Sequence, residues 1–261
     1  MRRFAALALL AAPSTAFAQA EDEGLGLSLG LGYASAYVWR GANLFGDGPQ
    51  ADQNMLLGPS LAWAIGDTGL SVGWWGGFQL NGENRAANVA GGVGAEQDVA
   101  LAWERDLTDA VTIDVGVTGF LYPLATEAAA GSDCPFYLDF AGGVGWSGPV
   151  DLGLRVSWFQ ATQSALTGFE HLYLNPSIAY ALEPSDRWSL EAALGLGYKL
   201  PFAAEIPENR WDVTLLVGVP IAVGGPVWVS PGFGVAWTER TGLGVRDEIA
   251  PWGALDVGAE F

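Results

Sequence analysis

The feature that most constrains the fold of this chain is an alternation of large and small side chains over residues 24–40. Large residues, first Leu and then Tyr and Trp, occupy every second position, and only Ser35 breaks the row. Up to Ala36 the residues between them are Gly, Ala or Ser. Because successive side chains of a strand point to opposite faces, the segment has one bulky apolar face and one face almost without side chains. A strand of a soluble sandwich would turn charged residues toward water, so the pattern favours a transmembrane β-barrel strand between lipid and a lumen.

The same period of two recurs along the rest of the chain, interrupted by clusters of Gly, Pro, Asn and Asp. It predicts an all-β fold, a transmembrane antiparallel up-and-down β-barrel of about twelve strands. Ten strands are the alternative, because residues 97–104 are short and weakly patterned. The expected strands are residues 24–40, 55–65, 70–80, 97–104, 111–122, 136–146, 150–160, 171–182, 188–200, 211–223, 227–239 and 252–261.

Four prolines lie inside these expected strands, where each removes one hydrogen bond of the ladder. A closed barrel has no edge strand to accommodate them, so we expect bulges or shifted strand boundaries there. They are Pro59, Pro176, Pro220 and Pro231.

The connections alternate in length, as they do in bacterial outer-membrane barrels with short periplasmic turns and longer outer loops. An even number of strands also places both termini on the periplasmic side. The short connections are residues 66–69, 105–110, 147–149, 183–187 and 224–226. The longer ones are residues 41–54, 81–96, 123–135, 161–170, 201–210 and 240–251.

Tryptophan positions indicate two aromatic girdles at the lipid–water interfaces, where an indole ring has apolar surroundings and a polar contact for its N–H. Eight tryptophans fall at strand ends with the parity of the large apolar residues. Trp75, Trp228 and Trp252 have the opposite parity, and Trp74 lies nearer the middle of a strand. The eight girdle candidates are Trp39, Trp63, Trp103, Trp146, Trp158, Trp188, Trp211 and Trp237.

Both ends of the sequence fit export to the bacterial outer membrane. Residues 1–18 have the Arg pair, apolar run and Ala-Phe-Ala ending of a cleaved signal peptide, which leaves residues 19–261 as the barrel. After residue 18 no apolar run approaches the roughly 18 to 20 residues of a membrane helix. Phe261 ends an alternating strand and resembles the C-terminal signal that the barrel-assembly machinery reads. Outer-membrane lipid and lipopolysaccharide are therefore the expected surroundings.

Charge and residue types exclude several classes of partner and cofactor. The net charge is −18 and Lys199 is the single lysine, which argues against nucleic acid. The acidity favours cations at the barrel mouth, or serves to keep the loops soluble. Cys134 and His171 are the single Cys and His, so neither a metal site nor any other cofactor is expected.

Residues 32–41, GYASAYVWRG, are followed shortly by Pro49. This stretch resembles the opening of the TorF family of porins, in which a Gly-rich strand reaches a Ser-x-Tyr-x-x-Arg-Gly signature and then a loop that carries a Pro. Ala36 departs from the family pattern, which has an acidic residue before the Tyr. The resemblance covers only the first strand and the loop after it, and it implies an outer-membrane barrel of poorly defined substrate.

Polar residues at the inward parity predict the lining of the lumen. Strand parity places Tyr37 and Trp39 on lipid and turns Arg40 inward, where it binds anionic solute groups or pairs with Asp139 or Asp212. Charges at such depth need water or each other, so the lumen is either a narrow wet channel or plugged by ion pairs. The predicted pore-lining residues are Arg40, Asp114, Asp139, Asp151, Arg155, Glu191, Lys199 and Asp212.

The sequence favours a non-enzymatic, porin-like channel for passive diffusion of small hydrophilic solutes or ions, with a preference for cations. One alternative is a plugged barrel that serves as a structural anchor or adhesion scaffold. Another is an outer-membrane lipid hydrolase, which would need His171 beside Ser157 or Ser177 on the lipid-facing side. No catalytic residue is assigned.

Overall fold

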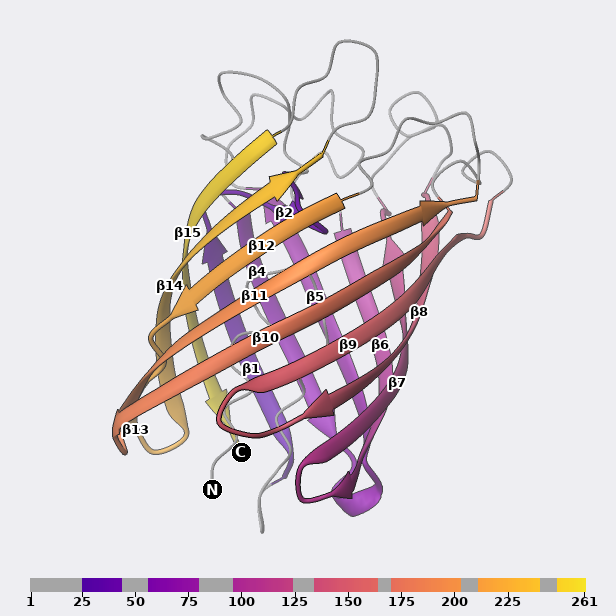
Figure 1. Ribbon diagram of the computed structural model, residues 1–261. Coiled ribbons are helices and arrows are strands. Elements are labelled where there is room, and N and C mark those ends of the chain that lie inside the picture. The colour runs from indigo at the N-terminus through magenta and orange to yellow at the C-terminus, as the bar shows by residue number, and fades with distance from the viewer. Residues whose placement is uncertain are drawn as a thin grey trace.

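The structure is a computed structural model that describes residues 25–43, 56–79, 96–123, 134–163, 170–202, 211–239 and 248–261. These residues form one closed, strongly tilted antiparallel barrel (Figure 1). Among them no helix is long and apolar enough to cross a membrane, and the helical element is the 3-10 turn η3 (Gly66–Thr68). The predicted signal peptide, residues 1–18, lies outside the described residues.

Twelve wall strands follow one another around the barrel, each paired with its neighbours in sequence, and β15 returns to β1. β12 and β13 together make one of these strands, interrupted between Gly218 and Ile221. The wall is formed by β1 (Leu27–Ala34), β4 (Leu56–Ala64), β5 (Leu70–Gln79), β6 (Glu96–Thr108), β7 (Val111–Leu121), β8 (Phe136–Trp146), β9 (Asp151–Ala161), β10 (His171–Ser185), β11 (Trp188–Pro201), β12 (Trp211–Gly218), β13 (Ile221–Gly224), β14 (Val227–Thr238) and β15 (Glu248–Glu260).

The barrel closes where the last strand meets the first. Leu27 N–H donates to the Phe261 carbonyl at 3.2 Å, and Phe261 N–H donates back to Leu27 at 2.8 Å. The start of β1 and the end of β15 therefore lie together, at the end of the barrel that carries the short turns (Figure 1).

This architecture confirms the predicted fold class with twelve strands. The ten-strand alternative is wrong because β6 is thirteen residues long and pairs with both neighbours along its length. The first strand is shorter than predicted, since it leaves the wall after Ala34.

The prolines perturb the sheet less than predicted. Pro59 pairs with Leu31 on β1, and Pro176 pairs with Leu154 on β9. On its other side, Pro59 has no ladder partner on β5, and Pro176 has none on β11. In both cases the pairing resumes beyond the proline in the same register. Pro231 also lies within a continuous strand, so bulges at these three positions were wrongly expected. The wall is interrupted at Val219 and Pro220, opposite Pro231: Val219 N–H donates to the Pro231 carbonyl and Ser189 N–H donates to the Pro220 carbonyl, but neither proline has an N–H to return the bond.

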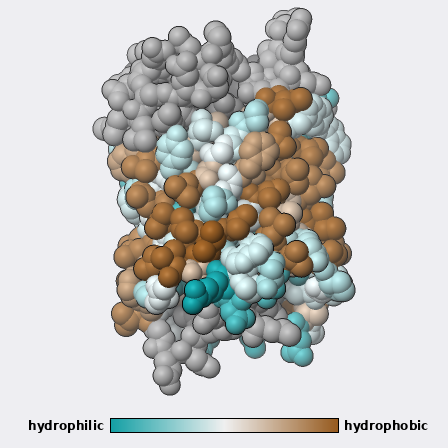
Figure 2. Space-filling view, turned by 90° about the vertical axis from the view of Figure 1, so that its left-hand side faces the viewer, coloured by the Kyte–Doolittle hydropathy of each residue, from teal (hydrophilic) through white to brown (hydrophobic). Residues whose placement is uncertain are grey.

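The outer face of the wall is apolar. Leu31, Val99, Leu194 and Leu255 are among many large aliphatic residues that are between two fifths and a half exposed. Figure 2 shows hydrophobic residues spread over the side of the barrel and hydrophilic ones gathered near its lower end. An apolar surface of this extent is unfavourable in contact with water and favourable in contact with the hydrocarbon of a membrane.

After Ala34 the chain turns into the barrel and forms a hairpin of β2 (Val38–Trp39) and β3 (Ala42–Asn43). Arg40 and Gly41 form its two-residue turn, with φ of 46° and 79°. Positive φ at both central residues is the geometry of the tight hairpin turn that matches strand twist. A Cβ at residue 41 would also collide with the side chain of Asp212, so only Gly fits. We refer to residues 35–43 as the inner hairpin.

We expect Leu194→Arg to destabilise the barrel by about 2–4 kcal/mol in lipid vesicles, because it places a charge on the outer face at mid-strand. Val223→Arg, on the short strand β13 beside a turn, should cost only about 0–1 kcal/mol. Urea unfolding of both variants in vesicles measures the difference. Equal costs would mean that the outer face does not meet hydrocarbon.

Candidate functional site

The inner hairpin is joined to wall strands far from it in sequence. At its start, Ser35 N–H donates to the Gly253 carbonyl, and Gly253 N–H donates to Ser35 Oγ, both at 2.9 Å. Ala36, Tyr37 and Val38 are at most 5% exposed. The hairpin is therefore held tightly inside the lumen.

Arg40 binds three side chains of the opposite wall. Its Nη2 donates to Asp139 Oδ2 and to Ser157 Oγ, each at 2.7 Å, and its Nη1 donates to His171 Nε2. A guanidinium group can only donate, so Nε2 accepts and the imidazole is neutral with its proton on Nδ1. The side chains of Arg40 and Asp139 are 7% and 15% exposed, which makes the contact a largely buried ion pair.

Aromatic rings enclose this ion pair. The guanidinium carbon of Arg40 lies 4.4 Å from the ring centre of Trp39 and 4.6 Å from that of Tyr173, within the range of cation–π attraction. The Trp39 ring itself packs against Phe159 at 5.3 Å and against Phe120 and His171 at 6.1 Å.

Trp39 was wrongly predicted to belong to the outer aromatic girdle, and Tyr37 was wrongly predicted to face lipid. Both lie inside the barrel, where the Tyr37 hydroxyl donates to Glu96 Oε1 at 2.9 Å. Parity along the first strand predicts the face of a side chain only while the strand belongs to the wall, and the wall ends at Ala34.

The other flank of the hairpin is apolar. Ala36 and Val38 pack with Leu216 of β12, Ala236 of β14 and Trp252 of β15, together with neighbouring alanines. Arg40 and Trp39 meanwhile contact β7 to β10 on the far side. The inner hairpin consequently crosses the bore near the end that carries the longer connections.

Two further predicted pore-lining residues surround the turn of the hairpin. Asp212, 2% exposed, accepts a hydrogen bond from the Tyr173 hydroxyl at 3.0 Å and borders Gly41. Lys199 is 5% exposed, and its Nζ lies 5.8 Å from the Trp39 ring centre. Of the two acidic partners predicted for Arg40, Asp139 forms the ion pair, and Asp212 binds Tyr173 instead.

The remaining predicted pore-lining residues lie toward the short turns. Arg155 forms an ion pair with Asp114, and these side chains are 34% and 27% exposed. Glu191 is buried and accepts a hydrogen bond from Ser189 Oγ at 3.1 Å. Asp151, at the start of β9, is exposed and shares the parity of Arg155. The lumen is thus more open below the inner hairpin than around it.

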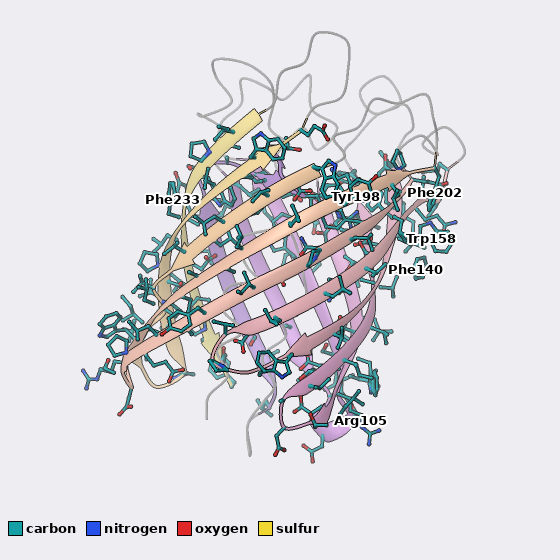
Figure 3. The ribbon with its side chains drawn as sticks, in the orientation of Figure 1. Arg105, Phe140, Trp158, Tyr198, Phe202 and Phe233 are labelled. Carbon is teal, nitrogen blue, oxygen red and sulfur yellow. The ribbon has the colours of Figure 1, made fainter. Side chains whose placement is uncertain are left out.

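Seven girdle candidates have the parity of the apolar outer face. Figure 3 shows Trp158 beside Phe140 on the outside of the barrel, with ring centres 5.8 Å apart. Trp75 and Trp252 lie instead on the inner face. The exposed members are Trp63, Trp146, Trp158, Trp188 and Trp211, and the half-buried ones are Trp103 and Trp237.

The hydrolase alternative finds no support in this geometry. Ser157 and His171 both lie in the lumen, bound to Arg40, whereas a lipid hydrolase needs them on the lipid-facing side. His171 Nε2, the basic nitrogen of this tautomer, accepts from Arg40 and cannot take a proton from a serine in this arrangement.

The inner hairpin was not predicted from the sequence. Two signals in the first strand point to it: Ser35 breaks the row of large residues, and the bulky Val38 sits where small residues should face the lumen. Glu96 was assigned to a loop, but it begins β6 and faces inward.

Solved structures share this fold. The KdgM porin superposes with a TM-score of 0.52 at 10% identity, covering 90% of this chain and 99% of its own. The NanC porin superposes with a TM-score of 0.50 at 12% identity, covering 90% of this chain and 98% of its own. LpxR from Salmonella typhimurium superposes with a TM-score of 0.51 at 12% identity, covering 90% of this chain and 100% of its own. Such low identity establishes the barrel fold alone.

In sequence, the model of a family described as "Bacterial protein of unknown function (Gcw_chp)" matches residues 18–233. The predicted resemblance to the TorF family stays a prediction, because the matching family carries another name. Among curated proteins, none matches the chain.

We expect Arg40→Met to destabilise the barrel by about 3–5 kcal/mol, because it leaves the Asp139 carboxylate buried without its partner. Adding Asp139→Leu should recover part of the loss, and the exposed Arg187→Met should change stability by less than about 0.5 kcal/mol. Urea unfolding in vesicles measures all three variants. An Arg40→Met barrel as stable as the wild type would show that the ion pair does not hold the hairpin.

Proposed function

The chain belongs to the Gcw_chp family of bacterial proteins of unknown function, and we propose that it is an outer-membrane channel for passive diffusion of small hydrophilic solutes or ions. The observation that carries this proposal is a lumen lined by small and polar residues and narrowed by the inner hairpin. The fold that it shares with the KdgM and NanC porins supports the same conclusion.

The inner face of the barrel suits water. Gly30 and Gly32 on β1 pair with Ser60 and Gly58 on β4, and the side chains that lie over these glycines carry polar atoms, from Ser60, Asp256 and the indole N–H of Trp75. Farther around, the partly exposed Arg155–Asp114 pair and the exposed Asp151 offer charges to solvent. A solute that enters from the short-turn end meets a hydrophilic bore until it reaches the inner hairpin, which sets the size limit.

Export and surroundings follow from this role. We propose that residues 1–18 are cleaved as a signal peptide and that the barrel-assembly machinery reads the strand that ends in Phe261. The outer face then lies in outer-membrane lipid and lipopolysaccharide, with the girdle tryptophans other than Trp39 at its two borders. The net charge of −18 supports a preference for cations.

A plugged barrel is the second candidate, because the inner hairpin is buried on both flanks. In that case the protein would be a membrane anchor or an adhesion scaffold, and the lumen would not conduct. We propose no enzymatic role, since Ser157 and His171 bind Arg40 inside the lumen.

Planar-bilayer recordings distinguish the two candidates. We expect small discrete conductance steps from the wild-type barrel and larger steps from Trp39→Ala, which thins the inner hairpin. Trp63→Ala is the matched control, because it removes an indole from the outer face and should leave the steps unchanged. A silent wild-type barrel would contradict the channel and favour the anchor.

The same recordings test ion preference. In a salt gradient the reversal potential should have the sign of cation selectivity, since the net charge attracts cations to the mouth. Raising the ionic strength should weaken this selectivity, because salt screens exposed charges. A reversal potential of the opposite sign would refute the cation preference and leave the channel itself standing.

A further inference from the structure

Two carboxylates of β6 are buried side by side on the inner face. Glu96 and Asp98 are two residues apart, which puts both side chains on the same side of the strand, and each is 2% exposed. Glu96 Oε1 accepts hydrogen bonds from the Tyr37 hydroxyl at 2.9 Å and from the Tyr122 hydroxyl at 3.2 Å. The three other oxygens, Glu96 Oε2 and both oxygens of Asp98, have no hydrogen-bond partner.

The arrangement is unfavourable as it stands. A buried carboxylate without a partner loses several kcal/mol of solvation free energy, and ionisation of both acids would place two like charges side by side. The acids nearest to arginine are different ones, since Arg40 pairs with Asp139 and Arg155 pairs with Asp114. Something other than these guanidinium groups must compensate Glu96 and Asp98.

Protonation alone does not satisfy the pair. A protonated Asp98 would lose its charge, but no hydrogen-bond donor reaches either of its oxygens or Oε2 of Glu96. A metal cation removes the charge and the unmet hydrogen-bonding capacity together, because it binds the oxygens directly. Both side chains are almost inaccessible, so a small ion fits where an organic solute would not.

We propose that Glu96 and Asp98 bind a hard cation of the calcium type, through Glu96 Oε2 and the two oxygens of Asp98. Carboxylate oxygens without nearby His or Cys ligands favour such ions, and calcium tolerates irregular oxygen shells. The described residues contain no group of three or more His, Cys, Asp or Glu that could hold a metal. Water and uncharged oxygens would therefore complete the shell.

The bound cation would strengthen the attachment of the inner hairpin. Glu96 accepts from Tyr37 of the hairpin and sits on β6 of the wall, so an ion that fixes Glu96 also fixes Tyr37. This inference does not depend on whether the barrel conducts, because an anchor would use the site in the same way.

Terbium luminescence tests the site directly, with the full-length barrel in detergent after removal of divalent ions. Trp75 is the ladder partner of Asp98 and can transfer excitation to a terbium ion bound there. We expect sensitised emission from the wild type that calcium suppresses, with apparent affinity more than about tenfold weaker in Asp98→Asn. Asp114→Asn, an inward carboxylate that pairs with Arg155, should keep the wild-type emission.

Thermal unfolding gives a second readout. Calcium should raise the unfolding temperature of the wild type, and it should have little effect on Asp98→Asn or Glu96→Gln. In the presence of a chelator Asp98→Asn should be at least as stable as the wild type, because it removes an uncompensated charge. The proposal would be overturned if millimolar calcium left the unfolding temperature of the wild type unchanged. It would also be overturned if calcium raised the unfolding temperature of Asp98→Asn as much as that of the wild type.

Discussion

The structure depends on one constraint, that a backbone N–H or carbonyl exposed to hydrocarbon must be hydrogen-bonded within the protein. An open sheet leaves two unpaired edges and cannot meet this requirement. The wall meets it by pairing β15 with β1, down to the reciprocal bonds between Leu27 and Phe261. The prolines fit the same requirement, since Pro59 and Pro176 lack bridges on one side only and leave the register intact.

Inside the barrel a related constraint applies to side chains. The inner hairpin enters the lumen with an arginine, and that charge is matched by Asp139, by two further hydrogen bonds and by surrounding rings. Glu96 and Asp98 differ, because three of their four oxygens are unmatched and neither acid pairs with Arg40 or Arg155. The proposed channel and the proposed cation site both come from this difference: one set of charges holds the inner hairpin that narrows the bore, and the other needs an ion.

Much of the fold was predictable because a membrane barrel repeats one simple rule, with large apolar residues outward and small or polar ones inward. That rule located the wall strands and the turns between them, and it assigned Trp75 and Trp252 to the face opposite the apolar one. It failed at Tyr37 and Trp39, where the chain had already left the wall. The candidate site was predicted only as separate inward charges, because pairs such as Arg40 with Asp139 join residues 99 positions apart.

The sequence by itself determined the class of fold and which face of each wall strand is apolar, because these depend on the local period of two and on the turn residues. Only the tertiary structure decided what fills the lumen. The path of residues 35–43 depends on contacts with β6 to β10 and with β12, β14 and β15. Those contacts join the hairpin to strands from all around the ring, so the local signals at Ser35 and Val38 do not identify its partners.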